Sequence, residues 1–135
     1  MEIRPADRND KQKILKYDNH IPHNKVGECI RNQLVYVLWD EGKIVGVLRY
    51  SLFWQSIPFL DLLYIDGDYR GKGYGRQMME HWESVMRVMK YKYVMLSTQE
   101  DETAKDFYEK LGYRRIGAFL PPEQDADEVM YLKEL

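Results

Sequence analysis

Residues 66–82 read DGDYRGKGYGRQMMEHW, and glycines crowd the first half of this stretch while helical spacing governs the second half. From Tyr74 onward apolar residues recur every three or four positions, which predicts an amphipathic helix over residues 74–90. Glycines before a helix let the backbone bend, and they let a ligand approach the free N–H groups of the first turn. The basic residues Arg70, Lys72 and Arg76 lie among them. The stretch therefore predicts a site for phosphate or pyrophosphate at a helix N-terminus.

The spacing of the glycines distinguishes three motifs that use this chemistry. The P-loop GxxxxGK[ST] does not fit, because three residues separate Gly67 from Gly71 and no hydroxyl residue follows Lys72. The dinucleotide fingerprint GxGxxG does not fit, because the third glycine of GKGYG comes one place early. RGKGYG at residues 70–75 satisfies a third pattern, [RQ]xxGx[GA]. If this motif stood alone, a glycine-rich turn that binds no ligand would be the alternative interpretation.

Hydrophobic periodicity and turn signals divide the rest of the chain into short strands and helices. We expect strands at residues 1–4, 34–40, 43–54, 57–66, 91–98, 113–120 and 128–135, and helices at 11–19, 23–33, 74–90 and 102–112. Asp7 or Asn9 is the expected cap of the first helix, and Gly112 ends the last. This order predicts an α+β (mixed α/β) fold with helices packed on a central sheet.

The long helix has an expected inner and outer face. The inner residues are Tyr74, Met78, Trp82, Met86 (or Val85) and Met89, and the outer residues are Arg76, Gln77, Glu80, Glu83, Arg87 and Lys90.

Composition limits the class of protein. Hydrophobic residues make up 44% and charged residues 31% of 135 residues, and the net charge of −2 implies no partnership with nucleic acid or membrane. The lone Cys29 cannot form an internal disulfide, and no signal peptide or membrane-spanning run is recognisable, so a cytoplasmic protein is expected. His20, His23 and His81 lack metal-ligand spacing, so no metal is expected.

Two motifs in order make the chain resemble the GNAT superfamily of acyl-CoA-dependent N-acetyltransferases. LLYIDGDYRGKGYGRQMM (62–79) is similar to the family's strand, pyrophosphate loop and helix. ETAKDFYEKLGYRRIG (102–117) is similar to its next helix, with Ala104, Tyr108, Gly112 and Tyr113 at the family's positions. The resemblance implies a mixed sheet of about six to seven strands flanked by about four helices, in a single domain over residues 1–135.

The resemblance also implies acetyl-CoA as the acyl donor, held between the strands at 59–65 and 93–98 with its pyrophosphate on the backbone of the loop. Relatives often carry an asparagine where this chain has Asp101; Gln99 could replace that contact, and Asp101 could equally cap the helix. The residues implied at the cosubstrate are Leu63, Tyr64, Ile65, Arg70, Gly71, Lys72, Gly73, Tyr74, Gly75, Arg76, Gln99, Asp101, Ala104 and Tyr108.

The implied chemistry is direct attack of an amine on a thioester, without a covalent enzyme intermediate. Tyr108 matches the family's general acid, with a core tyrosine as the alternative. Asp61, a carboxylate within an apolar strand, is the candidate base, with a structural aspartate as the alternative. His20, Arg49 and Trp54 are the candidates for the acceptor site, although aromatic residues on adjacent strands more often belong to a core.

We therefore expect an N-acetyltransferase that acts on a primary amine of a small molecule or protein. A catalytically inactive acyl-CoA-binding sensor or interaction protein of the same fold is the alternative, and a module that binds another nucleotide is a third. The resemblance further implies that a homodimer is one assembly to expect.

Overall fold

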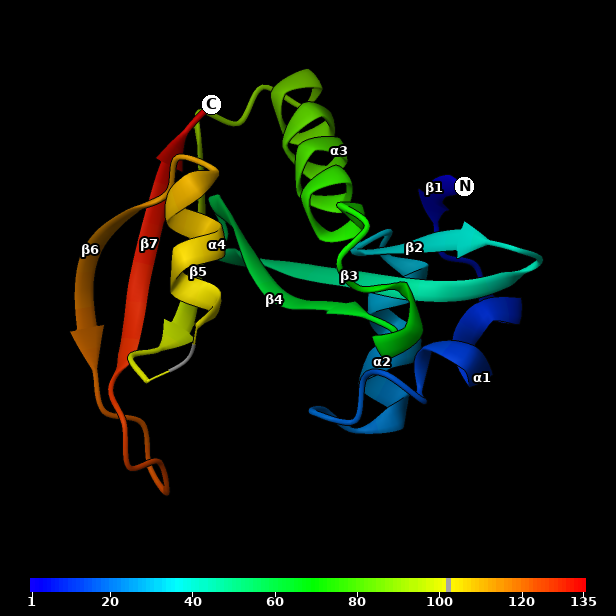
Figure 1. Cartoon of the computed structure of the whole chain (residues 1–135), viewed down its shortest axis with the longest axis horizontal. Coiled ribbons are helices and arrows are strands. Elements are labelled where there is room, and N and C mark those ends of the chain that lie inside the picture. Colours follow the sequence, from blue (N-terminus) through cyan, green and yellow to red (C-terminus); the bar gives the residue numbers. More distant parts are fainter. Residues whose placement is uncertain (102) are drawn as a thin grey trace. The chain divides into compact units, whose positions relative to one another are not determined.

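The computed structural model describes residues 1–101 and 103–135 (Figure 1). In these ranges seven strands form one sheet in the order β1-β2-β3-β4-β5-β7-β6. The strands are β1 (Glu2–Pro5), β2 (Val35–Asp40), β3 (Lys43–Phe53), β4 (Ile57–Ile65), β5 (Tyr93–Gln99), β6 (Arg114–Phe119) and β7 (Glu128–Glu134). The α-helices are α1 (Lys11–Ile14), α2 (His23–Arg31), α3 (Tyr74–Val88) and α4 (Ala104–Lys110), and two 3-10 helices are η1 (Arg8–Asp10) and η2 (Gly67–Tyr69).

The sheet is mixed, which confirms the predicted fold class. Strands β4 and β5 pair in parallel at Phe59↔Met95 and Leu60↔Leu96. Antiparallel pairing joins β1 to β2, β2 to β3, β5 to β7 and β6 to β7. None of the helices in the described ranges has both the length and the apolar character needed to cross a membrane.

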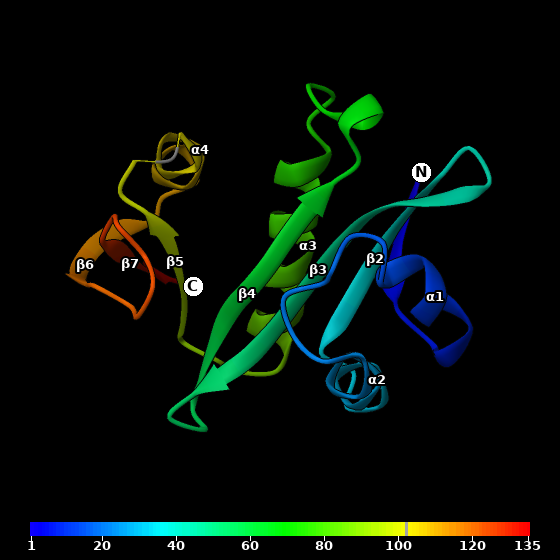
Figure 2. The same cartoon turned by 90° about the horizontal axis from the view of Figure 1, so that it is seen from below.

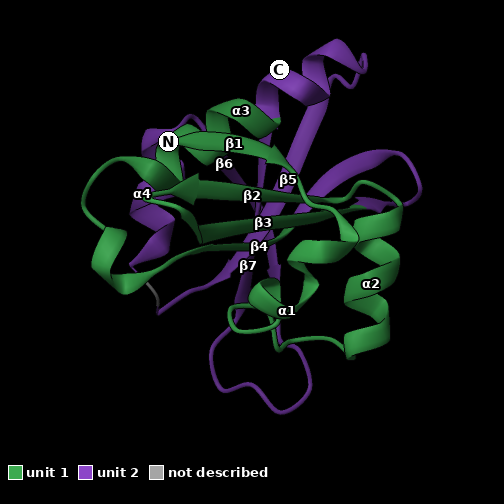
Figure 3. Cartoon of the chain, turned by 90° about the vertical axis from the view of Figure 1, so that its right-hand side faces the viewer, with its two compact units in different colours: residues 1–51, 61–82 green, residues 52–60, 83–135 purple. Residues whose placement is uncertain are grey.

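The chain divides into two compact units (Figure 3). Unit 1 comprises Met1–Ser51 and Asp61–Trp82, and unit 2 comprises Leu52–Leu60 and Glu83–Leu135.

Unit 1 is a helix-covered antiparallel sheet. Figure 1 shows α1 and α2 on one side of β2 and β3 and the first turns of α3 on the other. On α2, Val26 and Ile30 lie one helical turn apart and are buried, as their spacing predicts. The core cluster contains Ala6, Ile14, Val26, Ile30, Val35, Val37, Ile44 and Val47. Apolar burial on this face therefore holds α1 and α2 to the strands.

Unit 2 is built around β5, β7 and β6, with α4 beside β5 (Figure 2). The buried residues Val94 and Leu96 of β5 alternate along the strand with side chains of the other face, and so do Val129 and Tyr131 of β7. The Tyr131 hydroxyl donates to Oε2 of Glu109 on α4 over 2.8 Å. One face of this sheet therefore carries both the apolar core and a polar tie to the helix.

Local predictions for three features need correction: the first helix, the end of the long helix and Glu83. The first helix is much shorter than expected, because Asp7 caps η1 instead and α1 ends at Ile14. The long helix ends at Val88, so Met89 is 52% exposed and is not an inner residue. Glu83 was expected on the outer face but is only 3% exposed. It is buried because its carboxylate accepts hydrogen bonds from the Tyr113 hydroxyl at 2.7 Å and from Lys133 Nζ at 2.8 Å.

Gly46 of β3 tests the packing of unit 1. An added Cβ would lie 2.9 Å from Cδ1 of Ile65, 3.2 Å from Cβ of Leu38 and 3.3 Å from the Tyr64 carbonyl oxygen. We expect Gly46→Ala to lower the free energy of unfolding by about 1–3 kcal/mol in urea titrations, because the added methyl group overpacks the core. The control is Gly67→Ala, where an added Cβ meets nothing within 4 Å. A Gly46 variant as stable as the Gly67 variant would contradict this packing.

Candidate functional site

The loop that leaves β4 is fixed at its start by Asp66. One carboxylate oxygen accepts from the Asp68 amide at 3.0 Å, and the other accepts from the Tyr17 hydroxyl at 2.9 Å. These two hydrogen bonds favour the ionised form and hold the pKa of Asp66 below its usual range. Burial and the neighbouring carboxylate raise the pKa of Tyr17 to about 12. The Tyr17 ring also stacks on Tyr64, with ring centroids 5.1 Å apart, so β4 enters the loop along a fixed path.

Two glycines in left-handed backbone conformation shape the loop. The φ angles are +77° at Gly71 and +81° at Gly73. An added Cβ at either position would meet nothing within 4 Å, so these glycines serve the backbone conformation rather than close packing. The amide of Gln77 donates to the Gly73 carbonyl at 3.1 Å, which marks the start of α3. The N–H groups of the first turn consequently have no acceptor within the helix.

The charge at this helix start suits an anion. The first turn of α3 contains no acidic residue. Arg70 lies against the loop, because its Nε donates to the Ile65 carbonyl at 2.8 Å and its Cζ lies 5.1 Å from the Tyr64 ring centroid. Lys72 Nζ lies 5.0 Å from the Tyr69 ring centroid. The exposed Arg76 pairs with Glu80 at 2.8 Å, so part of its charge is offset.

Unit 1 brings together one group of the predicted cosubstrate residues, from the end of β4 to the start of α3. They are Leu63, Tyr64, Ile65, Arg70, Gly71, Lys72, Gly73, Tyr74, Gly75 and Arg76. Tyr74 is held on both sides, because its hydroxyl donates to Asp40 and its ring stacks on Tyr69. The Tyr74 side chain is therefore held in place beside the loop.

Unit 2 carries the remaining predicted cosubstrate residues. Tyr108 of α4 is 9% exposed, and its ring meets Phe107 and Tyr113 edge to face with centroids 5.0 and 6.0 Å apart. Gln99 ends β5 and Ala104 begins α4. Thr103 occupies the N-cap position of α4, so the alternative that Asp101 caps this helix is wrong. Glu102, the first residue of the predicted helix, lies outside the described residues.

Asp61 belongs to a cluster of charged residues in unit 1. Its Oδ2 lies 3.6 Å from Nη1 of Arg49, while Nε of Arg49 lies 2.6 Å from Oδ2 of the fully buried Asp18. Burial raises the pKa of Asp61, although the Ser51 hydroxyl and Arg49 act in the opposite direction. A carboxyl group with a raised pKa is a stronger base than an ordinary aspartate. Sequence reasoning missed Asp18, although a charged Arg49 within an apolar strand was a signal that a partner had to exist.

The three acceptor-site candidates have different surroundings. His20 is exposed between α1 and α2, whereas Arg49 is 6% exposed and bound by Asp18. Trp54, at the turn between β3 and β4, is 80% exposed. Their roles toward an acceptor remain predictions.

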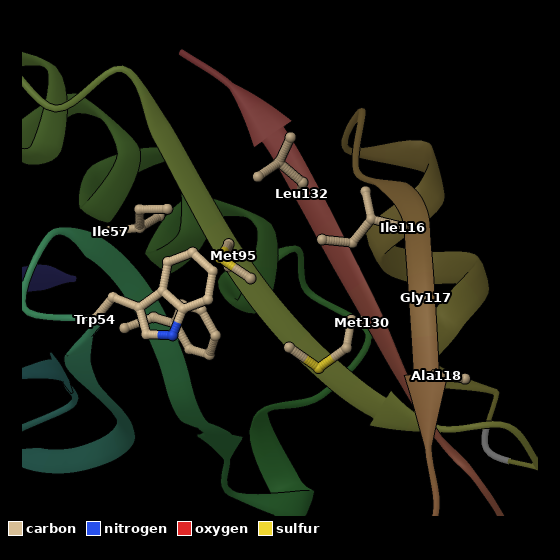
Figure 4. Close-up of a pocket in the computed structure, with 9 residues that line it drawn as sticks. Trp54, Ile57, Met95, Ile116, Gly117, Ala118, Met130 and Leu132 are labelled. Carbon is tan, nitrogen blue, oxygen red and sulfur yellow. The ribbon is translucent and has the colours of Figure 1, made fainter.

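Trp54 lines an apolar hollow of about 450 Å³ that lies within unit 2 (Figure 4). Figure 4 shows Met95, Met130, Leu132 and Ile116 lining it from neighbouring strands. The hollow suits an apolar group better than an ammonium group, because no charged side chain lines it.

Among the described residues, we find no cluster of three or more side chains of histidine, cysteine, aspartate or glutamate that could hold a metal ion.

A family model described as acetyltransferase (GNAT) domain matches residues 31–115. A comparison with curated protein sequences finds no significant match.

Solved structures share the fold at low sequence identity. A ribosomal-protein-alanine N-acetyltransferase from Brucella melitensis matches with a TM-score of 0.86 and 18% identity over 100% of both chains. Ard1 from Thermoplasma volcanium matches with a TM-score of 0.85 and 19% identity, over 99% of this chain and 97% of that one. A Bacillus anthracis Ames protein described as a streptothricin acetyltransferase, solved in complex with acetyl coenzyme A, matches with a TM-score of 0.68 and 20% identity over 75% of this chain and 61% of that one.

Tyr17→Phe tests the anchor of the loop. Because the hydrogen bond from Tyr17 depresses the pKa of Asp66, its contribution to stability is present above the usual aspartate pKa and is lost as the pH falls through the depressed value. We expect the variant to be less stable than the wild type at pH 7 in urea titrations, with the difference shrinking toward pH 2. Tyr64→Phe is the control, since it keeps the ring that stacks on Tyr17. A stability difference independent of pH would contradict this assignment.

Proposed function

Because the chain belongs to the GNAT acetyltransferase family, we propose that it transfers an acetyl group from acetyl-CoA to a primary amine of a small molecule or protein. The observation that carries the proposal is the left-handed pair Gly71 and Gly73, which opens the N-terminus of α3 to an anion. One protein of similar fold was solved with acetyl coenzyme A bound, which supports the same cosubstrate here.

The loop supplies the main contacts to the cosubstrate. Backbone N–H groups of the segment from Gly71 to Arg76 donate to the pyrophosphate, and the helix dipole of α3 adds to their attraction. The N–H group of Arg70, which the sequence also suggested as a donor, already donates to the Gly67 carbonyl at 3.4 Å. Leu63, Tyr64 and Ile65 lie beside the pantetheine arm. In unit 2, Gln99, Asp101, Ala104 and Tyr108 complete the set of cosubstrate residues.

The reaction is aminolysis of a thioester in a ternary complex. An alkylammonium group, with a pKa of about 10 in lysine, first loses a proton to a base. The nitrogen lone pair then forms a C–N bond with the thioester carbonyl carbon. When the intermediate collapses, the C–S bond breaks and its electron pair leaves on sulfur, which takes up a proton. The nitrogen loses a second proton, so one proton is released overall.

Two side chains have proposed roles in these proton transfers. Asp61 accepts the proton of the ammonium group, and its raised pKa suits it to that role. Tyr108 donates a proton to the departing sulfur, because a phenol hydroxyl can act as a proton donor. Cys29 is not a nucleophile in this scheme, since burial raises the pKa of its thiol.

Gly73→Ala tests the loop. We expect the affinity for acetyl-CoA in calorimetry to fall by about tenfold or more, because forcing a Cβ into this conformation displaces the amides, and ~1.4 kcal/mol of lost contact corresponds to a factor of ten. The matched control is Gly42→Ala, because Gly42 has a φ of +78° and equally open surroundings but lies in the β2–β3 turn. Equal losses of affinity in the two variants would show that backbone strain alone, and not the loop, is responsible.

An acetyl-transfer screen tests the function itself. The protein is incubated with acetyl-CoA and separate polyamines, aminoglycosides, amino acids and peptides, and release of free thiol is followed. We expect release with at least one class of amine. Acetyl-CoA binding without release for any amine would favour the catalytically inactive alternative, and the absence of binding would exclude both.

The same assay examines Tyr108. With a responsive amine, we expect Tyr108→Phe to lower turnover by about 10²-fold with little change in acetyl-CoA affinity, because only the proton donor is removed. Tyr113→Phe is the matched control, since its hydroxyl binds the buried Glu83 and has no proposed chemical role. Unchanged turnover in the Tyr108 variant would remove its assigned role.

A further inference from the structure

Two carboxylates in unit 1 share one guanidinium group unequally. Asp18 holds Arg49 with two contacts, from Nε to Oδ2 at 2.6 Å and from Nη2 to Oδ1 at 3.4 Å. Asp61 reaches only Nη1, at 3.6 Å. The side chains of Asp18 and Arg49 are 0% and 8% exposed, whereas that of Asp61 is 25% exposed. The buried Asp18 carboxylate therefore makes the closer contacts with the Arg49 guanidinium, and the Asp61 carboxylate, which reaches solvent, makes the weaker one.

The cluster carries a net charge of −1, because two carboxylates face one guanidinium. The groups that act on Asp61 are Arg49 and the Ser51 hydroxyl from β3, and Asp18 from the segment after α1. Burial is the main influence on the pKa of the Cys29 thiol on α2, and the charges of Arg49, Asp61, Asp18 and Glu28 also act on it. Of these groups Arg49 alone is cationic, and Asp18 has already engaged it.

A purely structural role for the cluster would not require Asp61. A buried arginine needs a counter-ion, and Asp18 supplies it with two hydrogen bonds. Burial is the main cause that raises the pKa of Asp61, and bringing this second carboxylate to the same guanidinium adds like-charge repulsion from Asp18 that acts in the same direction. The arrangement therefore leaves the ionised form of Asp61, the carboxylate that solvent can reach, less stabilised than it would be without Asp18.

We propose that Asp18 is a positioning residue that engages Arg49 and so leaves the Asp61 carboxylate under-neutralised, able to take a proton from an acceptor that arrives as an ammonium cation. This inference rests on the proposed function, in which Asp61 receives that proton. The N–H bond of the ammonium group breaks, the proton goes to a carboxylate oxygen of Asp61, and the electron pair stays on nitrogen. Asp61 later returns the proton to solvent. The acceptor is therefore a basic alkylamine rather than a weakly basic aromatic amine.

The sharpest test is the titration of Asp61 in the protein without ligands, followed by carboxyl ¹³C NMR. In the wild type we expect a midpoint above ~3.9, the usual aspartate value. Asp18→Asn releases Arg49 to Asp61, so the midpoint falls by about 1 unit. Arg49→Gln leaves two carboxylates without a cation, so the midpoint rises by about 1 unit. These opposite shifts separate positioning from general destabilisation, which would not move the midpoint in two directions.

Asp10→Asn is the matched control. It removes an arginine–aspartate pair of unit 1, Arg4–Asp10 at 2.8 Å, that does not act on Asp61. We expect the Asp61 midpoint to be unchanged in this variant. If one cluster variant fails to fold, the direction of the shift in the other variant tests the inference, and a wild-type midpoint at or below the usual aspartate value overturns it.

Kinetics separate this inference from the proposed function. With a responsive alkylamine, the acidic limb of the pH profile of kcat/KM for the amine is expected to move to lower pH in Asp18→Asn, together with the NMR midpoint. An active wild type whose acidic limb and Asp61 midpoint do not move in Asp18→Asn would overturn the inference alone. Failure of the wild type to acetylate any amine would overturn the proposed function, and this inference with it.

Discussion

The left-handed backbone at Gly71 and Gly73 is the constraint on which the end of β4 and the start of α3 depend. Residues with a Cβ rarely adopt this conformation, so the chain can turn here without strain only through glycine. The turn lets α3 begin with the hydrogen bond from Gln77 to Gly73, and it leaves the N–H groups of the first turn free of helical partners. The geometry of the candidate site is thus a property of the main chain before any side chain is considered.

Buried carboxylates tie distant segments together in both units. Asp18 and Arg49, 31 positions apart, join the segment after α1 to β3. Glu83 binds the hydroxyl of Tyr113 and the amine of Lys133, which come from segments 30 and 50 positions away. A buried charge is costly unless it is paired, so these contacts favour one arrangement of the chain over others. The two groups of contacts differ in one respect, because the cluster around Asp18 also includes Asp61, a carboxylate that solvent reaches.

Periodicity and turn chemistry were sufficient to predict the order of the elements, because both act over a few residues. The i,i+4 spacing of Val26 and Ile30 identified the inner face of α2, and glycine spacing identified the loop. The same reasoning failed for Glu83, since charge alone assigned it to the outer face, while its partners lie far along the chain. Asp61 stood out as a charge within an apolar strand, but nothing local indicated Asp18.

The proposed use of backbone donors by the loop also affects how readily its sequence can diverge. Every residue except proline carries an N–H group, so replacing Lys72 or Gln77 changes a side chain without deleting a donor. Only the two left-handed positions restrict residue identity, through φ rather than through chemistry. Such a site has high mutational robustness, and selection can remodel the surface around the loop while the donors persist. An enzyme built this way can change its acceptor over evolutionary time and keep the same acyl donor.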